Sequence, residues 1–155
     1  MASKRQRIVA AIVARMKLIN GTGDYVTNIA NRAQDSQTGW QEEELPAISV
    51  FDLAANATPA SIGAGIPRPG ILHDMQVMIR GFVKSGSDSS DVRQLLADIQ
   101  TAIRQDFTWT DGTGPTVMQT RQISDEVTRT DSFEIDGCVQ TIEVQFITQK
   151  FNAVT

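Results

Sequence analysis

The stretch from Ser89 to Phe107 constrains the fold more than any other part of this sequence. Its apolar residues recur at intervals of three and four, which places them in one stripe along a helix. The stripe consists of Val92, Leu95, Leu96, Ile99, Ala102, Ile103 and Phe107. Ser89 or Ser90 can cap the first turn, and Asp91 lies where the helix dipole favours an anion. Because such a stripe must be covered, we predict a core helix packed on an extended layer.

A second helix is predicted from Ser3 to Leu18, with an apolar stripe of its own. Its stripe consists of Ile8, Ile12, Met16 and Ile19. Ser3 can cap the first turn, and Asn20-Gly21 is a typical helix stop. The segment that follows, GTGDYVTNI, begins with turn residues. Tyr25, Thr27 and Ile29 then alternate as in a strand. Its glycines lack the spacing and the lysine of a phosphate-binding loop.

Four further segments have the residue pattern of β-strands. They are residues 47–53, 71–84, 116–130 and 138–151. The first is apolar on both faces, which indicates a covered central strand, and Gly81 in the second is a candidate β-bulge. Two helices on one face of a mixed, mostly antiparallel sheet satisfy this order of elements. We therefore predict an α+β fold and a single domain over residues 1–155, a normal domain length.

The segment between the first two predicted strands is rich in glycine and proline. These residues are Pro59, Gly63, Gly65, Pro67, Pro69 and Gly70. We predict a long loop over residues 53–72, and a connection of this length in a compact domain is usually functional or mobile. The alternative is a long hairpin that becomes ordered only against a partner.

Composition excludes several classes of protein. With one cysteine, Cys138, and one histidine, His73, the chain has no disulfide framework and no usual zinc site. No apolar run reaches the roughly 18 residues of a membrane span. The basic start followed by IVAAIVA faintly resembles a signal peptide, but Arg15 and Lys17 interrupt it. We expect a cytosolic product that binds no cofactor or metal.

Charge is unevenly distributed along the chain. The residues before Asp24 include five basic and no acidic side chains, and the remainder has nine basic and eighteen acidic ones, which gives the net charge of −4. The sequence pI of about 4.9 argues against sequence-specific DNA binding. The basic segment is either a solvated helix face or a patch that contacts an acidic partner. Both interpretations remain open from the sequence.

Residues 34–44 are polar except for Trp40, and they end in Glu42, Glu43 and Glu44. An exposed tryptophan is often an anchor of a protein interface. It can equally cover the edge of the core, and the sequence does not choose between the two.

The order of these segments resembles the tail terminator proteins of tailed bacteriophages, the lambda-type terminator and its relatives. The resemblance rests on RQRIVAAIVARMKLINGTGDYVTNI, the polar stretch with Trp40, the strand ELPAISVFD, the helix that begins after SSDVR and the two closing strands. It covers most of the chain. The helix with the GTGDY turn and the Glu44-Leu45-Pro46 start of the first core strand are its strongest parts. The Pro59–Gly70 segment matches no pattern of that family.

The resemblance implies an α+β subunit without catalytic residues that forms a hexameric ring in the virion after assembly in the host cytoplasm. Such a ring caps the completed tail tube, ends tube growth and joins the tail to the neck. Its partners are other copies of the chain, the tail tube protein and a neck or head-completion protein. DNA passes through the lumen without specific binding, and no membrane is involved. For the subunit or tube interface we nominate Lys4, Arg5, Arg7, Trp40, Glu42, Glu43, Glu44 and Arg68.

A head-to-tail ring needs two different patches on each subunit. The basic first helix and the acidic remainder supply opposite charges, so we expect Glu42–Glu44 to face a neighbour's Lys4, Arg5 and Arg7. Exposed edges of the long strands can also pair between subunits by strand addition.

Three alternatives remain open at this point. Another ring of the same neck, such as a head–tail stopper or a tail completion protein, has the same size and chemistry. An enzyme would have to use His73, oriented by Asp74, because no other imidazole exists. A small binding domain would use the Pro59–Gly70 segment as its ligand loop.

Overall fold

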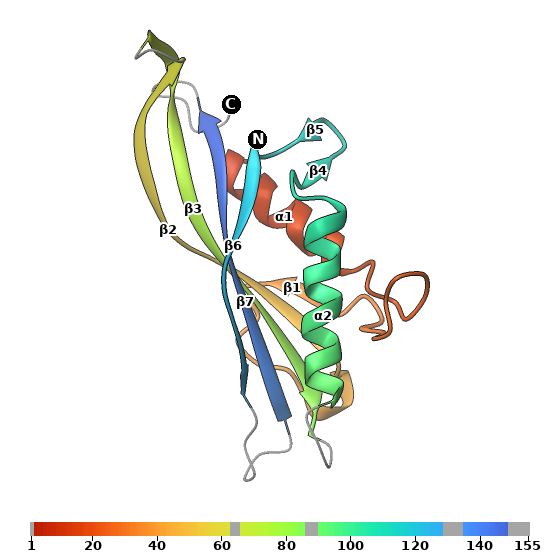
Figure 1. The fold of residues 1–155 in the computed structure, drawn as a ribbon. Helices are drawn as coiled ribbons and strands as arrows, with labels where there is room; N and C mark the ends of the chain where they lie inside the picture. Colours follow the sequence, from red (N-terminus) through yellow and green to blue (C-terminus); the bar gives the residue numbers. More distant parts are fainter. Residues whose placement is uncertain (1, 63–65, 86–89, 129–134, 149–155) are drawn as a thin grey trace.

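The computed structural model describes residues 2–62, 66–85, 90–128 and 135–148 (Figure 1). Two helices lie against one face of a five-stranded sheet, and a small separate hairpin lies beside them. The elements are α1 (Lys4–Met16), β1 (Ala33–Asp35), the 3-10 helix η1 (Glu42–Glu44), β2 (Ala47–Ile62), β3 (Ile66–Lys84), α2 (Ser90–Gln105), β4 (Thr110–Asp111), β5 (Gly114–Pro115), β6 (Gln119–Thr128) and β7 (Ile135–Thr148). The predicted α+β class is confirmed.

The sheet has the strand order β1-β2-β3-β7-β6. β1 is parallel to β2, and the other three pairings are antiparallel. β3 and β7 pair without interruption from Ile71–Thr148 to Lys84–Ile135, which is the longest unbroken pairing in the sheet. The sheet is therefore mixed and mostly antiparallel, as predicted.

Burial alternates strictly along β7 and identifies the covered face of the sheet. Cys138, Ile142 and Val144 are buried under the helices, whereas Thr141 and Glu143 on the opposite face are only half-buried. Side chains that alternate in this way show a strand with one covered face and one open face. In the described part of the chain, the second face of the sheet is therefore covered by neither α1 nor α2.

α2 forms as its apolar stripe predicts, and six of the seven stripe residues are buried. Phe107 is the exception. It follows the end of the helix and its side chain is 53% exposed, so its assignment to the core was wrong. The position lies after Gln105, where the chain no longer follows the helical period. Ser89, the other predicted cap, lies outside the described residues.

α1 begins at the predicted cap, Ser3, which forms a capping box with Gln6. The Ser3 hydroxyl accepts a hydrogen bond from the Gln6 amide at 3.2 Å, and the Gln6 side chain accepts one from the Ser3 amide at 2.8 Å. These bonds satisfy two amides at the helix start. The helix ends at Met16, and Leu18 is already half exposed.

The strand predicted around Tyr25 does not form. Residues 21–31 are irregular apart from a single bridge between Asn20 and Asn28. Tyr25 and Ile29 are nevertheless buried, so their alternation reflects two core contacts made by a loop. A period of two over five residues cannot distinguish these cases.

The loop predicted over residues 53–72 is also wrong, because β2 and β3 continue as a hairpin to Ile62 and Ile66. We call the part of β2 and β3 in residues 53–72 the arm; Figure 1 shows it rising past the helices. Its register shifts at two places, between Asp52 and Ala55 and between Pro59 and Ser61. Proline is tolerated at irregularities and on strand edges that need no amide donor. The density of glycine and proline was therefore compatible with strands here, and the loop that it predicted does not form.

The predicted turn around residues 131–134 and the predicted strand ends at Thr130 and Phe151 lie outside the described residues. β6 begins at Gln119 rather than at Thr116.

Gly81 is not a bulge, because its register with Ile48 and Cys138 is unbroken. Instead it makes room for α2. A Cβ atom at this position would lie 2.7 Å from Leu95 Cδ2 and 2.8 Å from Cys138 Sγ. Both neighbours are buried, so neither can move into solvent. The glycine sets how closely α2 approaches β3.

We expect Gly81→Ala to lower the free energy of unfolding by about 1–3 kcal/mol, the usual cost of an overpacked core. Gly39→Ala is the matched control, because a Cβ atom at Gly39 meets nothing within 4 Å. Urea unfolding followed by circular dichroism compares the two. Equal stability of both variants would show that α2 can shift away from the sheet at little cost.

Candidate assembly surfaces

Two of the four basic residues nominated for assembly bind acidic groups of their own chain. Arg5 donates to the Asp52 carboxylate and the Leu53 carbonyl on β2. Arg7 donates through Nε and Nη2 to Asp111 Oδ2 at 3.1 and 2.9 Å. These bonds fix α1 to the sheet and to the β4–β5 hairpin.

Lys4 lies in a shallow and mainly apolar groove. Partial burial, followed by the nearby Arg7 charge, lowers the pKa of Lys4. The other lining residues are Thr108, Pro115, Thr116, Val117, Met118, Phe146 and Ile147. Lys4, Arg5 and Arg7 are thus divided between internal ion pairs and one groove, and these three residues do not form the continuous free patch that their charge suggested.

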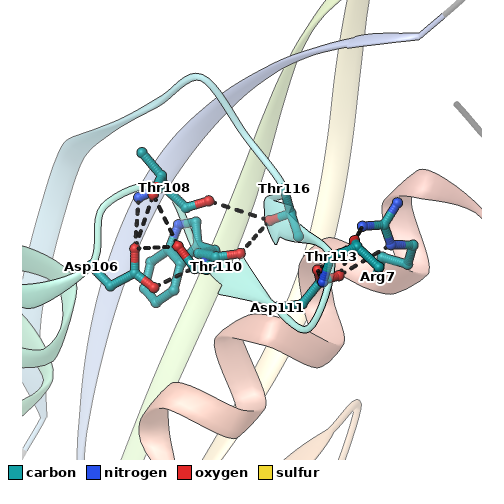
Figure 2. Close-up of polar contacts among 8 residues, drawn as sticks. Arg7, Asp106, Thr108, Thr110, Asp111, Thr113 and Thr116 are labelled. Atoms are coloured by element: carbon teal, nitrogen blue, oxygen red, sulfur yellow. Dashed lines mark hydrogen bonds and ion pairs between the residues drawn. The ribbon is translucent and has the colours of Figure 1, made fainter.

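The β4–β5 hairpin is fixed by a network of carboxylates and threonines (Figure 2). Asp106 Oδ2 accepts from the Thr110 amide at 2.8 Å, and Asp106 Oδ1 accepts from the Thr108 hydroxyl at 3.0 Å. Asp111 Oδ1 accepts from the Thr113 hydroxyl at 2.7 Å and from the Thr113 amide at 2.8 Å. Short side chains that bind amides two to four residues away close turns of this kind.

Both carboxylates in this network favour their charged form. The Thr113 hydroxyl and amide, and then Arg7, lower the pKa of Asp111 to about 2. Burial alone would raise the pKa of Asp106, but the hydrogen bonds from Thr110 and Thr108 lower it. Their lone pairs are used within the chain, and the residues that the structure describes contain no cluster suited to a metal ion. The network is structural.

Trp40 covers the sheet face opposite the helices. Its indole Nε1 donates to Ser49 Oγ at 2.8 Å, and Ser49 is fully buried. Ser49 pairs with Arg80 of β3, so the two side chains lie on the same face of the sheet. The next residue of β3, Ile79, is buried on the helix side, and adjacent residues of a strand point to opposite faces. Ser49 and Trp40 therefore lie on the face away from the helices. Of the two interpretations of Trp40, the structure favours the one in which its side chain covers the core. Its side chain remains partly exposed.

The three glutamates form η1, which follows Trp40 in the chain. Glu42 Oε1 lies 2.9 Å from Lys84 Nζ. Glu44 accepts from the Gln41 amide at 2.7 Å, and Glu43 is exposed. Pairing of this run with the basic helix of a neighbouring copy stays a prediction, with Arg5 and Arg7 already bound within the chain.

Arg68 lies in the arm, on β3, and its side chain is outside the described residues. Its assignment to an interface also stays a prediction. The β2 side of the arm is well described, and every residue from Leu53 to Thr58 is exposed.

His73 and Asp74 do not form a catalytic pair. The His73 ring stacks on Phe146 at 4.8 Å, and its Nε2 lies 2.8 Å from Thr148 Oγ1. Asp74 accepts from Gln145 Nε2 at 2.9 Å, on the opposite face of the strand. Burial lowers the pKa of His73, against the smaller opposing effect of the Asp74 charge. The arrangement that an enzyme would need is therefore not made by these two residues.

Asp98, which lies fully buried on α2, was not identified as a functional or structural residue from the sequence. Its carboxylate accepts from the Thr27 amide at 2.7 Å and from the Val26 amide at 3.3 Å. It thereby holds the irregular 21–31 loop against the helix. An acidic residue between Leu95 and Ile99 is the one signal that could have identified it, since a charge is rarely fully buried without partners.

No protein-family model and no curated protein match this chain. Solved structures that match it include a chain from the virion of a native gene transfer agent particle. That chain is 12% identical, the alignment covers 90% of this chain and 93% of that one, and the TM-score is 0.47. Within the described residues, no helix is long and apolar enough to cross a membrane.

Proposed function

We propose that this chain is a structural subunit of a phage-like particle, and specifically a tail terminator. Six copies form a ring that caps the tail tube, ends its polymerisation and joins the tail to the neck. The tube protein and a neck protein are the other partners of the ring. No catalytic step and no cofactor belongs to this function.

The arm is the observation that carries the proposal. β2 and β3 continue past the layer covered by the helices, and every β2 residue from 53 to 58 is exposed along the outer edge of the sheet. β7 pairs with β3 as far as Ile71, and the described residues of β2 and β3 beyond that point pair only with each other, as a two-stranded ribbon. An isolated two-stranded hairpin is marginally stable in water. A chain that extends such a ribbon away from its core is suited to contacts with other subunits. An assembly protein requires such exposed contact surfaces, and this function does not depend on a ligand pocket.

The sequence resemblance to terminators agrees with the observed fold. The GTGDY turn lies between α1 and the sheet, and the Glu44-Leu45-Pro46 segment leads into β2, the second strand of the sheet. Net charge supports passage of DNA, because six copies at −4 each carry −24. An acidic lumen repels the phosphate backbone and prevents adhesion.

Light scattering after size exclusion, with and without the cognate tail tube protein, tests the function. We expect a species near six times 16.9 kDa, and tubes of fixed length when the chain is added during tube polymerisation. Bovine serum albumin at the same concentration controls for crowding. Tubes that grow to the same lengths with and without the chain would contradict the proposal.

A further inference from the structure

The described part of the sheet has two long unpaired edges, and they lie on opposite sides. On one side, β1 pairs only with Ile48, Ser49 and Val50, so the outer edge of β2 has no strand partner beyond Val50. On the other side, β6 pairs with β7 alone. Unpaired edges expose amide and carbonyl groups that can pair with another chain.

Between Leu53 and Pro59, the outer edge of the arm lacks the usual protection against such pairing. Arg5 binds the Leu53 carbonyl, and beyond it Ala54–Thr58 contains neither charge nor proline. All five residues are exposed, and three of them are alanines. Natural proteins normally shield a long edge with charges, proline or a covering segment. An edge left neutral and small-chained is suited to a permanent strand partner.

The β6 edge has different side chains. Its residues from Arg121 to Thr128 are all exposed, and they include Arg121, Asp125 and Glu126. Two apolar side chains also reach solvent there, with Ile123 42% and Val127 37% exposed. If two copies paired through their β6 edges, some registers would place acidic side chains next to each other. Against the neutral arm edge no like charges meet in any register.

We infer that the arm edge of one copy, Ala54–Thr58, adds as a strand to the β6 edge of the next copy. This inference rests on the proposed ring and names its subunit contact. The two edges are different, so the contact is head-to-tail and can close into a ring. In the closed ring both edges of every copy are paired, and the sheet continues from subunit to subunit. A symmetric dimer through either edge would leave the other edge of each copy exposed.

Cysteine pairs placed on the two edges test the contact. Ala55 or Ala57 is changed to cysteine on the arm, and Ser124 or Glu126 on β6, and a short bismaleimide is added. Native Cys138 should not react with the bismaleimide, because it is buried and burial raises the pKa of its thiol to about 12. Chains with one cysteine on each edge should give a ladder of products up to six copies in at least one combination.

The single-cysteine chains are the matched controls. Each alone should remain uncross-linked, and a mixture of an arm variant with a β6 variant should give dimers only. Cross-linked dimers of Ala57→Cys alone, or of Glu126→Cys alone, would overturn the inference in favour of a symmetric contact. A chain that stays monomeric at all concentrations would overturn it as well.

Charge reversal supplies a second test. Ala55→Asp with Ala57→Asp adds two negative charges to an edge that would meet the acidic β6 edge, where either Asp125 or Glu126 lies on the same face of the joined sheet, so we expect ring association at least about tenfold weaker. Asp125→Lys with Glu126→Lys in the same chain should restore it. Ala10→Asp with Ala14→Asp, on the exposed side of α1, is the control of equal charge. Unchanged association of the arm variant would overturn the inference.

The outcomes separate this inference from the proposed function. A hexamer that gives no edge-to-edge cross-links refutes the strand contact and leaves the terminator function standing. A cross-linked ladder without any effect on tube length retains the contact and refutes the function.

Discussion

Replacing Trp109 with alanine should lower the free energy of unfolding by about 3–5 kcal/mol, the range for removing a large buried aromatic side chain. Trp109 is the largest fully buried side chain of the described residues. Its indole Nε1 donates to Thr120 Oγ1 at 2.8 Å, which connects the β4–β5 hairpin to β6. Its backbone has a φ of +49°, a conformation that costs a non-glycine residue energy. The surrounding contacts must therefore supply more than this cost.

Urea unfolding followed by far-ultraviolet circular dichroism measures the loss. Trp40→Ala is the matched control, because Trp40 has a similar indole bond, to Ser49, but its side chain is only half-buried. We expect a smaller loss there, about 1–2 kcal/mol. Trp109→Phe should retain most of the packing and lose chiefly the hydrogen bond. If Trp109→Ala costs no more than Trp40→Ala, the hairpin does not contribute to the core as described.

Replacing Asp98 with alanine should lower the free energy of unfolding by about 2–4 kcal/mol. The change leaves the Thr27 and Val26 amides without their acceptor, and an unsatisfied buried donor costs about 1–3 kcal/mol. It also removes the acceptor for Gln94 Nε2, which lies 3.1 Å from Asp98 Oδ1. Asp98→Asn retains one acceptor oxygen and should lose less.

Hydrogen exchange of the two amides gives a local readout of this prediction. Exchange at Val26 and Thr27 should accelerate in Asp98→Ala beyond the change expected from global stability alone. Asp91→Ala, at the exposed start of the same helix, is the control and should change stability by less than about 1 kcal/mol. Unchanged exchange at both amides would show that the 21–31 loop is held by Tyr25 and Ile29 without the carboxylate.

The assembly surfaces were less predictable than the fold. Lys4, Arg5 and Arg7 were nominated because the first helix is basic, but Arg5 and Arg7 bind Asp52 and Asp111. Their partners are 47 and 104 residues away in the chain, so no local pattern reveals these pairs. The opposite error concerned residues 53–72. Glycine and proline predicted a loop there, but residues 53–62 and 66–72 form strands because they pair with each other. Local composition does not reveal such a pairing.

The sequence alone determined the two helices, the strand-forming segments and the α+β class. Each depends on a periodicity or a cap that acts within about four residues, such as the α2 stripe or the Ser3 capping box. The tertiary structure alone decided the arm, the burial of Asp98, the close approach at Gly81 and the two unpaired edges. These features arise from contacts between segments far apart in the chain. Their free energy depends on distances that only the folded arrangement sets.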